Sequence, residues 1–256
     1  SVGHKNSKDS VNHAVERGLL PILEDKLLGM TSDKDSDSLN DEWGKCLEKL
    51  GDRKTIDSLS EKDISSLNTF YNLEEVPEEY PKCKRGVFVT LSGGVVDDQD
   101  SFDSLFGKDN TCKKLVTEEF LFNTKARNKK FRNEAREKII LGWLEVGAAC
   151  DHAQRKNRLH RYLFSALVPS EYLEMVCDNS ESKMSLKAHD GIYRSPLFQY
   201  KKEQYVLLAS FRYTSGLHSD SHVLDKPIFR LKEQIINEIA FAWSKHSIRP
   251  GITSFR

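Results

Sequence analysis

The side chains with the most varied chemistry lie together in the stretch LEVGAACDHAQRKNRLHRY, residues 144–162. Within a few positions it offers a carboxylate, a thiol, a second carboxylate, an imidazole and an amide, at Glu145, Cys150, Asp151, His152 and Gln154. Cysteine and histidine are common zinc ligands, and an aspartate can complete a mixed site. The stretch could therefore hold a metal, contact a phosphate backbone, or only turn a corner.

The spacing within this stretch favours the corner over the metal. Adjacent side chains on an extended chain point to opposite faces, so Cys150 and Asp151 cannot easily bind one ion together. We predict no metal or other cofactor, and expect GAACDHAQ to end a central strand, with Cys150 mostly buried and Asp151 accepting bonds from backbone amides. If an ion such as Zn²⁺ is bound, its candidate ligands are Cys150, His152, His160, Cys177 and His189.

A metal-dependent nuclease or other hydrolase is the main catalytic alternative. Nucleases with a restriction-enzyme-like core place an aspartate on one strand and Glu-x-Lys, or a variant with Gln, on the next. Here Gly147 stands where the lysine after Glu145 would be, so the group that polarises the attacking water is missing. Mg²⁺ would be held by carboxylates. The residues to consider are Glu145, Asp151 and Gln154, with Asp97, Asp98, Asp100 or Asp103 before them and Lys156 after.

Two weaker patterns offer other chemistry. Cys150 and His152 could form a nucleophile pair, but no Gly-rich turn that would make an oxyanion hole precedes the thiol. His218 and His222 are four residues apart, a spacing that brings imidazoles together only on a helix, whereas their stretch has the composition of a loop.

Two basic clusters flank the same predicted strand. Side by side they could contact several nucleic-acid phosphates, and the alternative is a solvated surface that balances the acidic loop at 97–109. The first cluster is Lys125, Arg127, Lys129, Lys130 and Arg132, and the second is Arg155, Lys156, Arg158, His160 and Arg161.

The composition narrows the class of protein. The chain has 256 residues, 38% of them hydrophobic and 30% charged, with a formal net charge of zero, so any nucleic-acid binding must rest on a local patch. No apolar stretch approaches the length of a membrane span. Five cysteines without a C-x-x-C pair predict reduced thiols and a cytoplasmic protein. An initial serine hints that the chain is a piece of a longer protein.

Patterns of apolar residues predict the elements that must position these groups. Helices are expected at 11–28, 41–51 and 58–73, the last capped by Ser58 or Ser60, and a charged helix at 125–138. Strands are expected at 86–91, 139–150 and 160–169, followed by a short helix capped by Ser170 and a hairpin turning at KKE, residues 201–203. The stretch 92–111 is expected to be irregular.

The last element is expected to be a helix over about 226–247, capped by Asp225, with Pro227 in its first turn and Ile235, Ile239 and Trp243 on its buried face. The strands follow one another without regular crossover helices, so the fold class is α+β. We predict a helical N-terminal region over 1–80. A domain over 81–256 would then hold a small antiparallel sheet or half-open β-barrel with a packing C-terminal helix.

RGVFVTL, GWLEVGAACDHAQRK and the ending FRLKEQIINEIAFAWSKHSIRPGITSF together resemble a group of poorly characterised bacterial proteins. Some of those follow a receiver-like domain or lie among anti-phage defence genes. The resemblance covers residues 83–256, and Cys150, Asp151 and Gln154 match its short signature. It implies a regulatory or defence-associated module. The missing catalytic signature, the zero net charge and the hydrophilic N-terminal loops favour a non-enzymatic regulatory or interaction module, whose helical N-terminal region contacts a protein partner or adjacent domain. The metal-dependent hydrolase and a nucleic-acid-binding module without catalysis are the alternatives.

Overall fold

The computed structural model describes residues 60–108, 110–122, 129–153, 159–176 and 191–247. Contacts divide the chain into two compact units, Ser1–Tyr71 and Asn72–Arg256, so the division falls before the boundary expected at residue 80. The described part of the first unit is residues 60–71, which form helix α4 (Glu61–Asn72) up to its last residue and confirm the helix predicted after Ser60. The helices expected at 11–28 and 41–51 lie outside the described residues.

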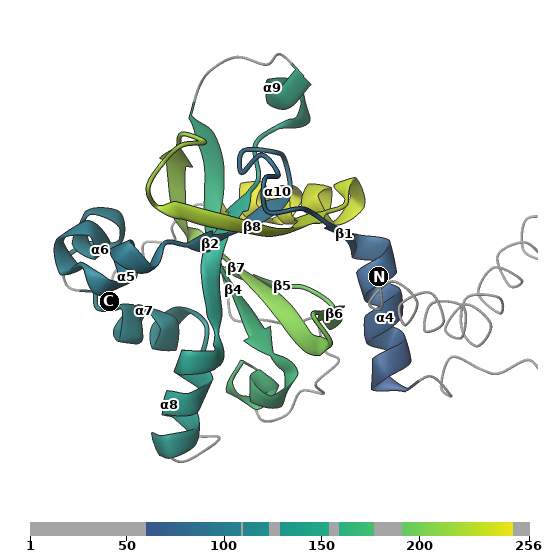
Figure 1. The fold of residues 1–256 in the computed structure, drawn as a ribbon, viewed down its shortest axis with the longest axis horizontal. Helices are drawn as coiled ribbons and strands as arrows, with labels where there is room; N and C mark the ends of the chain where they lie inside the picture. The colour runs from purple at the N-terminus through teal and green to yellow at the C-terminus, as the bar shows by residue number, and fades with distance from the viewer. Residues whose placement is uncertain (1–59, 109, 123–128, 154–158, 177–190, 248–256) are drawn as a thin grey trace, which may run out of the picture. The chain divides into compact units, whose positions relative to one another are not determined.

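The second unit is built on one antiparallel sheet, which curls as a half-open barrel (Figure 1). The strand order is β1-β8-β2-β3-β4-β7-β5, with β6 paired to β7 as well. The bounds are β1 Leu73–Glu75, β2 Val87–Leu91, β3 Ile140–Glu145, β4 His160–Pro169, β5 Ile192–Arg194, β6 Phe198–Tyr200, β7 Glu203–Leu217 and β8 Leu224–Leu231. The predicted α+β class is confirmed, and β3 lies in the middle of the sheet.

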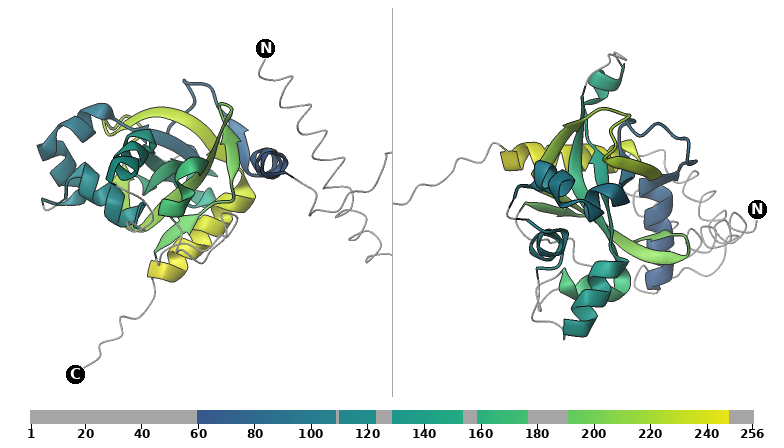
Figure 2. Two further views of the ribbon diagram at one scale, coloured as in Figure 1. Left: turned by 90° about the horizontal axis from the view of Figure 1, so that it is seen from below. Right: turned by 60° about the vertical axis from the view of Figure 1, so that its left-hand side comes forward.

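Each face of the sheet is covered by its own set of helices (Figure 2). One face packs against the segment that joins β2 to β3 and against the short 3₁₀ helix η3 (Ser170–Met175), around Phe102, Trp143 and Phe164. The other face packs against α10 (Glu233–Ser247) through Ile235, Ile236 and Ile239. The helices between β2 and β3 are α5 Gly93–Asp97, α6 Gln99–Phe106, α7 Cys112–Glu119 and α8 Lys129–Lys138.

Most of the predicted strands and turns are confirmed. β2 and β4 occupy the expected stretches, and α8 lies within the charged helix predicted at 125–138. The hairpin between β6 and β7 turns at Lys201 and Lys202, whose φ values of 47° and 72° fit a two-residue turn of the type that matches strand twist. The predicted cap at Ser170 is wrong, because the residue that precedes η3 is Pro169 and no side chain caps it.

The prediction of an irregular stretch at 92–111 is wrong, since α5 and α6 form there. The Asp98 carboxylate caps α6 by accepting a hydrogen bond from the Ser101 amide at 3.0 Å. Phe102 and Phe106, one turn apart, are both buried on the sheet. The acidic side chains that suggested a loop are the cap and the exposed face of this amphipathic helix.

The predicted start of the C-terminal helix is also wrong, because the residues from Leu224 to Leu231 form β8. Pro227, Phe229 and Leu231 are buried while the residues between them are less so, which is the two-residue period of a strand. Asp225 therefore caps no helix, and Pro227 lies opposite Val89 on β2 at a register shift. Only α10 belongs to the predicted helix, and the buried face expected at Ile235 and Ile239 is confirmed.

Candidate metal centre

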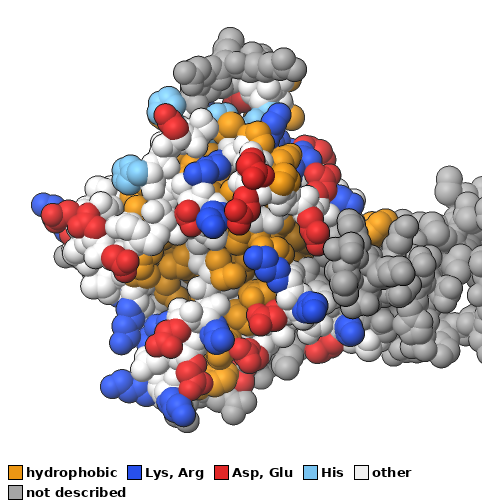
Figure 3. Space-filling model, in the orientation of Figure 1, with side chains coloured by type: hydrophobic (Ala, Val, Ile, Leu, Met, Phe, Trp, Pro, Cys, Tyr) orange, Lys and Arg blue, Asp and Glu red, His pale blue; other side chains and the backbone are white. Residues whose placement is uncertain are grey.

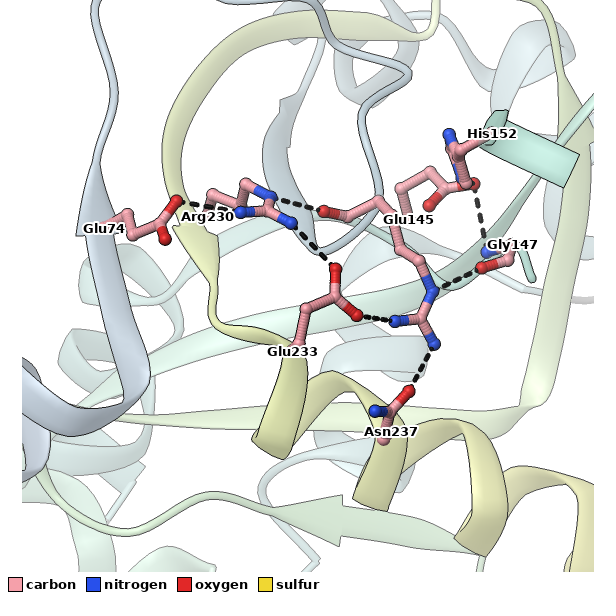
Figure 4. Close-up of polar contacts among 8 residues, drawn as sticks. Glu74, Glu145, Gly147, His152, Arg230, Glu233 and Asn237 are labelled. Atoms are coloured by element: carbon pink, nitrogen blue, oxygen red, sulfur yellow. Dashed lines mark hydrogen bonds and ion pairs between the residues drawn. The ribbon is translucent and has the colours of Figure 1, made fainter. Parts of the chain in front are cut away.

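Three side chains from the stretch at residues 144–162 lie close together at one end of the sheet. β3 ends at Glu145 and β4 begins at His160, and because the two strands pair antiparallel, these ends are neighbours. Between them the chain leaves the sheet at Gly147 and forms the short helix α9 (Ala149–Ala153), which carries His152 back toward Glu145. Two adjacent strands and one helical turn thus position a carboxyl group and two imidazoles. Figure 4 shows Glu145 with one of the two histidines, His152.

The ligand atoms of these residues lie close enough to share an ion. His152 Nε2 is 3.1 Å and His160 Nδ1 is 3.8 Å from the same oxygen, Glu145 Oε1. One ligand atom from each residue lies within 4.8 Å of the others, and the two imidazole rings stack with centroids 5.6 Å apart. Within the described part of the chain, this is the one group of three or more such residues with that spacing.

The carboxyl group of Glu145 is wholly buried, with a relative exposure of 0%. Oε1 accepts a hydrogen bond from the Gly147 amide at 3.0 Å. Oε2 is buried without a hydrogen-bond partner among the described residues. A buried oxygen without a partner costs free energy that a bound cation or a proton would recover.

Burial controls the protonation of this group. Desolvation raises the pKa of Glu145 to about 8, against the opposing effects of the Gly147 hydrogen bond and the Arg85 charge. Burial, followed by the charge of His160, lowers the pKa of His152. Both shifts favour the uncharged forms of Glu145 and His152, the two groups joined by the 3.1 Å contact.

Gly147 leaves the space in which the ligand atoms meet. A Cβ at this position would lie 2.5 Å from Glu145 Oε1 and 3.1 Å from His152 Nε2. Any other residue would therefore fill the gap between the carboxylate and the imidazole. Gly147 occupies the position at which the nuclease motif has a lysine, and its lack of a side chain makes it part of the site.

Two further side chains, those of Arg85 and Tyr162, make hydrogen bonds next to the site. Arg85 Nε donates a hydrogen bond to the Gly147 carbonyl at 2.7 Å. Tyr162, opposite Glu145 on β4, donates from its hydroxyl to the Lys82 carbonyl at 3.1 Å. Burial, and then the charge of Glu145, raises the pKa of Tyr162, so its hydroxyl stays protonated as a donor.

The structure corrects part of the predicted corner. The chain does turn at the end of a central strand, but Cys150 is exposed and lies on α9, so its predicted burial is wrong. Alternation along a strand therefore does not govern Cys150 and Asp151. The backbone amide of Asp151 donates a hydrogen bond to the Ala148 carbonyl at 2.9 Å. The charge of the Asp151 carboxylate raises the pKa of both Glu145 and His152. Gln154, Cys177 and His189 lie outside the described residues.

The nuclease arrangement of carboxylates is absent from this cluster. Among the described residues, the group of ligand atoms around Glu145 contains two histidines and none of Asp97, Asp98, Asp100 or Asp103. His218 and His222 are also outside it. Asp98 is engaged at the start of α6, where the Ser101 hydroxyl and amide lower its pKa.

The described members of the two basic clusters lie far apart along the sheet. α8, which carries Lys129, Lys130 and Arg132, precedes β3, whereas His160 and Arg161 begin β4 at the other end of β3, where α9 also lies (Figure 1). The remaining members, Lys125, Arg127, Arg155, Lys156 and Arg158, lie outside the described residues. On the face drawn in Figure 3, acidic and basic side chains are interspersed, and the histidines lie toward the end that carries α9.

Comparison of the chain with family models, curated proteins and solved structures found no match. No helix among the described residues is long and apolar enough to cross a membrane. The case for a function therefore rests on the geometry of Glu145, His152 and His160.

Proposed function

We propose that this chain is a metal-dependent hydrolase that binds one divalent ion of the zinc class through Glu145, His152 and His160. The observation that carries the proposal is the convergence of two imidazole nitrogens on one buried carboxylate oxygen. Two histidines and a glutamate with one open position are a common ligand set of catalytic zinc. This set replaces the carboxylate-held Mg²⁺ of the nuclease hypothesis, because Mg²⁺ prefers oxygen ligands.

The burial of the three ligands supports an open coordination position toward solvent. The Glu145 side chain is 0% exposed, whereas those of His152 and His160 are 18% and 21% exposed. An ion held between them would have its carboxylate ligand on the inside and its imidazole ligands at the rim. Solvent would then reach the fourth position, where a catalytic zinc holds water.

A metal-bound water in that position would supply a hydrolytic nucleophile. An ion held by Glu145, His152 and His160 would lower the pKa of a bound water and so supply the nucleophile for attack on a carbonyl or phosphoryl centre. Hydrolysis would form one bond from the water oxygen to that centre, break the bond to the leaving group and transfer the proton of the water to the leaving group.

Metal binding is the first test of this proposal. Chelator-treated protein should take up about one equivalent of Zn²⁺ or Co²⁺ in a calorimetric titration. His152→Ala and His160→Ala should each weaken binding at least about tenfold, because each removes a direct ligand. His222→Ala, which changes a histidine outside the cluster, is the matched control. Equal affinity in all four proteins would contradict the site. Turnover of plasmid and of simple aryl ester and phosphodiester substrates by the loaded protein, lost in the two ligand variants, would establish hydrolysis.

Gly147→Ala tests the same site without changing any ligand. The added methyl group would crowd Glu145 Oε1 and His152 Nε2, so we expect at least about a tenfold loss of Zn²⁺ affinity. Gly94→Ala is the control, since a Cβ at that position meets nothing closer than 3.8 Å. Retention of wild-type affinity by Gly147→Ala, measured in the same titration, would show that the ion does not lie between these residues.

A regulatory or interaction module of a bacterial signalling or phage-defence system is the second proposal. Phe241 favours it, because this aromatic side chain on α10 is 66% exposed, and exposed aromatics often contribute to protein interfaces. The three described cysteines are free thiols, which supports the proposed cytoplasmic location. Co-purification of a defined protein partner with the wild-type chain, and its loss with Phe241→Ala, would support this role. A monomeric chain without a partner in either form would count against it.

Nucleic-acid binding without catalysis is the least favoured proposal. Its premise was that the two basic clusters lie side by side, and their described members stand at opposite ends of β3. Phosphate contacts would give an affinity that falls steeply with added salt. Absence of binding to duplex or single-stranded DNA and RNA at low salt would exclude it.

A further inference from the structure

Arg85 joins the turn of the candidate centre to the C-terminal helix. Its side chain is only 8% exposed, yet it carries a full charge. Nε donates to the Gly147 carbonyl at 2.7 Å, one amino group pairs with the Glu233 carboxylate, and the other donates to Asn237 Oδ1 at 2.9 Å. A buried guanidinium with each nitrogen engaged has one defined orientation. Figure 4 labels its three partners, Gly147, Glu233 and Asn237.

The peptide group that joins Arg85 to Gly86 is also held by hydrogen bonds. The Arg85 carbonyl accepts a hydrogen bond from Arg230 Nε at 2.8 Å, and the Gly86 amide donates to the Glu145 carbonyl at 3.0 Å. Arg230 also bonds to Glu74 and Glu233 at 2.9 Å each. These contacts connect β1, β8 and α10 to the end of β3 that carries Glu145.

Gly147 connects the fixed Arg85 side chain to the ligand atoms of the site. Its carbonyl is held by Arg85, while its amide donates to Glu145 Oε1 at 3.0 Å. The same residue begins the turn that places His152 on α9. If the Arg85 bond were lost, the peptide planes around Gly147 could rotate, and the carboxylate and His152 would no longer be held in the spacing that an ion requires.

We infer that Arg85 is a positioning residue of the metal centre, and that α10 regulates the metal affinity through its Asn237 and Glu233 contacts to Arg85. The inference rests on the proposed function. Arg85 is itself positively charged, so it can assist the binding of a metal ion only by positioning Gly147 and the ligands, and not by its charge. By charge alone, the guanidinium repels a divalent ion and lowers its affinity.

The two effects of Arg85 therefore have opposite signs, and a substitution separates them. If charge dominates, Arg85→Met removes a repulsion and strengthens metal binding. If positioning dominates, the same change weakens metal binding by roughly tenfold, as losses of supporting contacts around metal ligands do. Arg85→Lys keeps the charge but cannot bond to Gly147, Glu233 and Asn237 together, so it should weaken binding as well.

Asn237→Ala provides a test from the side of α10. Asparagine is uncharged, so this change leaves the electrostatics of the centre nearly unaltered while removing one hydrogen bond that orients Arg85. We expect a severalfold loss of affinity, smaller than that of Arg85→Met. This variant also keeps the inference testable if Arg85→Met fails to fold.

The experiment is a Co²⁺ titration of the full chain, followed by visible absorption and by calorimetry, with a thermal melt of each variant. The visible bands of Co²⁺ report the geometry of its ligands, which a merely structural role of Arg85 would not change. Arg212→Met is the matched control. It removes an arginine that pairs with a buried glutamate, Glu119, at a nearest distance of 3.1 Å. This pair lies in another part of the fold from Arg85.

Weaker Co²⁺ binding and altered bands in Arg85→Met and Asn237→Ala, with Arg212→Met unchanged, would support the inference. Wild-type binding with equal or stronger affinity in both variants would overturn it and leave the proposed function standing. A wild-type chain that binds neither Co²⁺ nor Zn²⁺ would overturn both.

Discussion

Metal-free protein is expected to become less stable as the pH rises from about 5 to about 8, and Glu145→Gln is expected to abolish most of that loss. The pKa of Glu145 is raised from 4.5 to about 8 by burial. Below pH 4.5 the carboxyl group is protonated in both the folded and the unfolded chain. Between the two values only the unfolded chain releases the proton, so the free energy of unfolding falls throughout this window and levels off above about pH 8.

The expected size of this effect is large for one residue. Each unit of pKa difference corresponds to about 1.4 kcal/mol, so the Glu145 shift costs several kcal/mol across the window, a large share of the stability of a typical domain. His152 opposes it in part. Because burial lowers the pKa of His152, its contribution is lost as the pH falls through 6.5 and regained above it.

Glu145→Gln isolates the carboxyl group. Glutamine resembles the protonated acid in shape and stays neutral, so the variant should be close to wild type at pH 5 and more stable than wild type at pH 8. Urea denaturation of chelator-treated proteins at four pH values between these limits measures the difference. Parallel pH profiles for the two proteins would mean that Glu145 is ionised in the folded state.

The environment of Glu145 explains why the sequence could not predict its role fully. Glutamate at the end of an apolar run can lie at the exposed end of a strand, and its burial follows only from the packing of the folded sheet. Strands were predicted at 139–150 and 160–169, and antiparallel pairing of those bounds places Cys150, rather than Glu145, beside His160. β3 instead ends at Glu145, which pairs with Tyr162 near the start of β4. His152 could not be placed either, because the alternation of an extended chain was applied to residues that form the five-residue helix α9.

The wrong start of the C-terminal helix has a physical cause, which is that a short apolar pattern fits more than one period. The residues from Pro227 to Leu231 fit a helix at spacings of three and four and fit a strand at a spacing of two. Pairing with β1 and β2 decides in favour of the strand, and that information lies far away in the sequence. β4 was predicted with correct bounds because its continuous apolar run, ended by Pro169, is typical of a strand buried on both faces.

Because residues Leu224 to Leu231 form β8 and not the start of the helix, a truncation that tests the contribution of α10 to stability must begin after β8. Removing everything from Asp225 would delete β8, which lies between β1 and β2, and would unfold the sheet for a trivial reason. Ending the chain after Lys232 removes α10 and the residues beyond it and leaves every strand in place. We expect this shorter chain to lose cooperative unfolding. Its missing helix buries Ile235, Ile236 and Ile239, and each large side chain is worth roughly 1.5–3 kcal/mol.

A substitution within α10 tests the contribution of its buried face to stability without deleting the contacts to Arg85. Ile239 is 0% exposed and packs on the sheet, so Ile239→Ala should lower the free energy of unfolding by about 2–5 kcal/mol. Phe241, two residues later and 66% exposed, is the matched control, and Phe241→Ala should change stability by less than about 0.5 kcal/mol. Thermal and urea denaturation of both variants measure these differences. A soluble truncated chain that melts cooperatively, together with a neutral Ile239→Ala, would show that α10 does not hold the sheet and that its apolar face serves an interface instead.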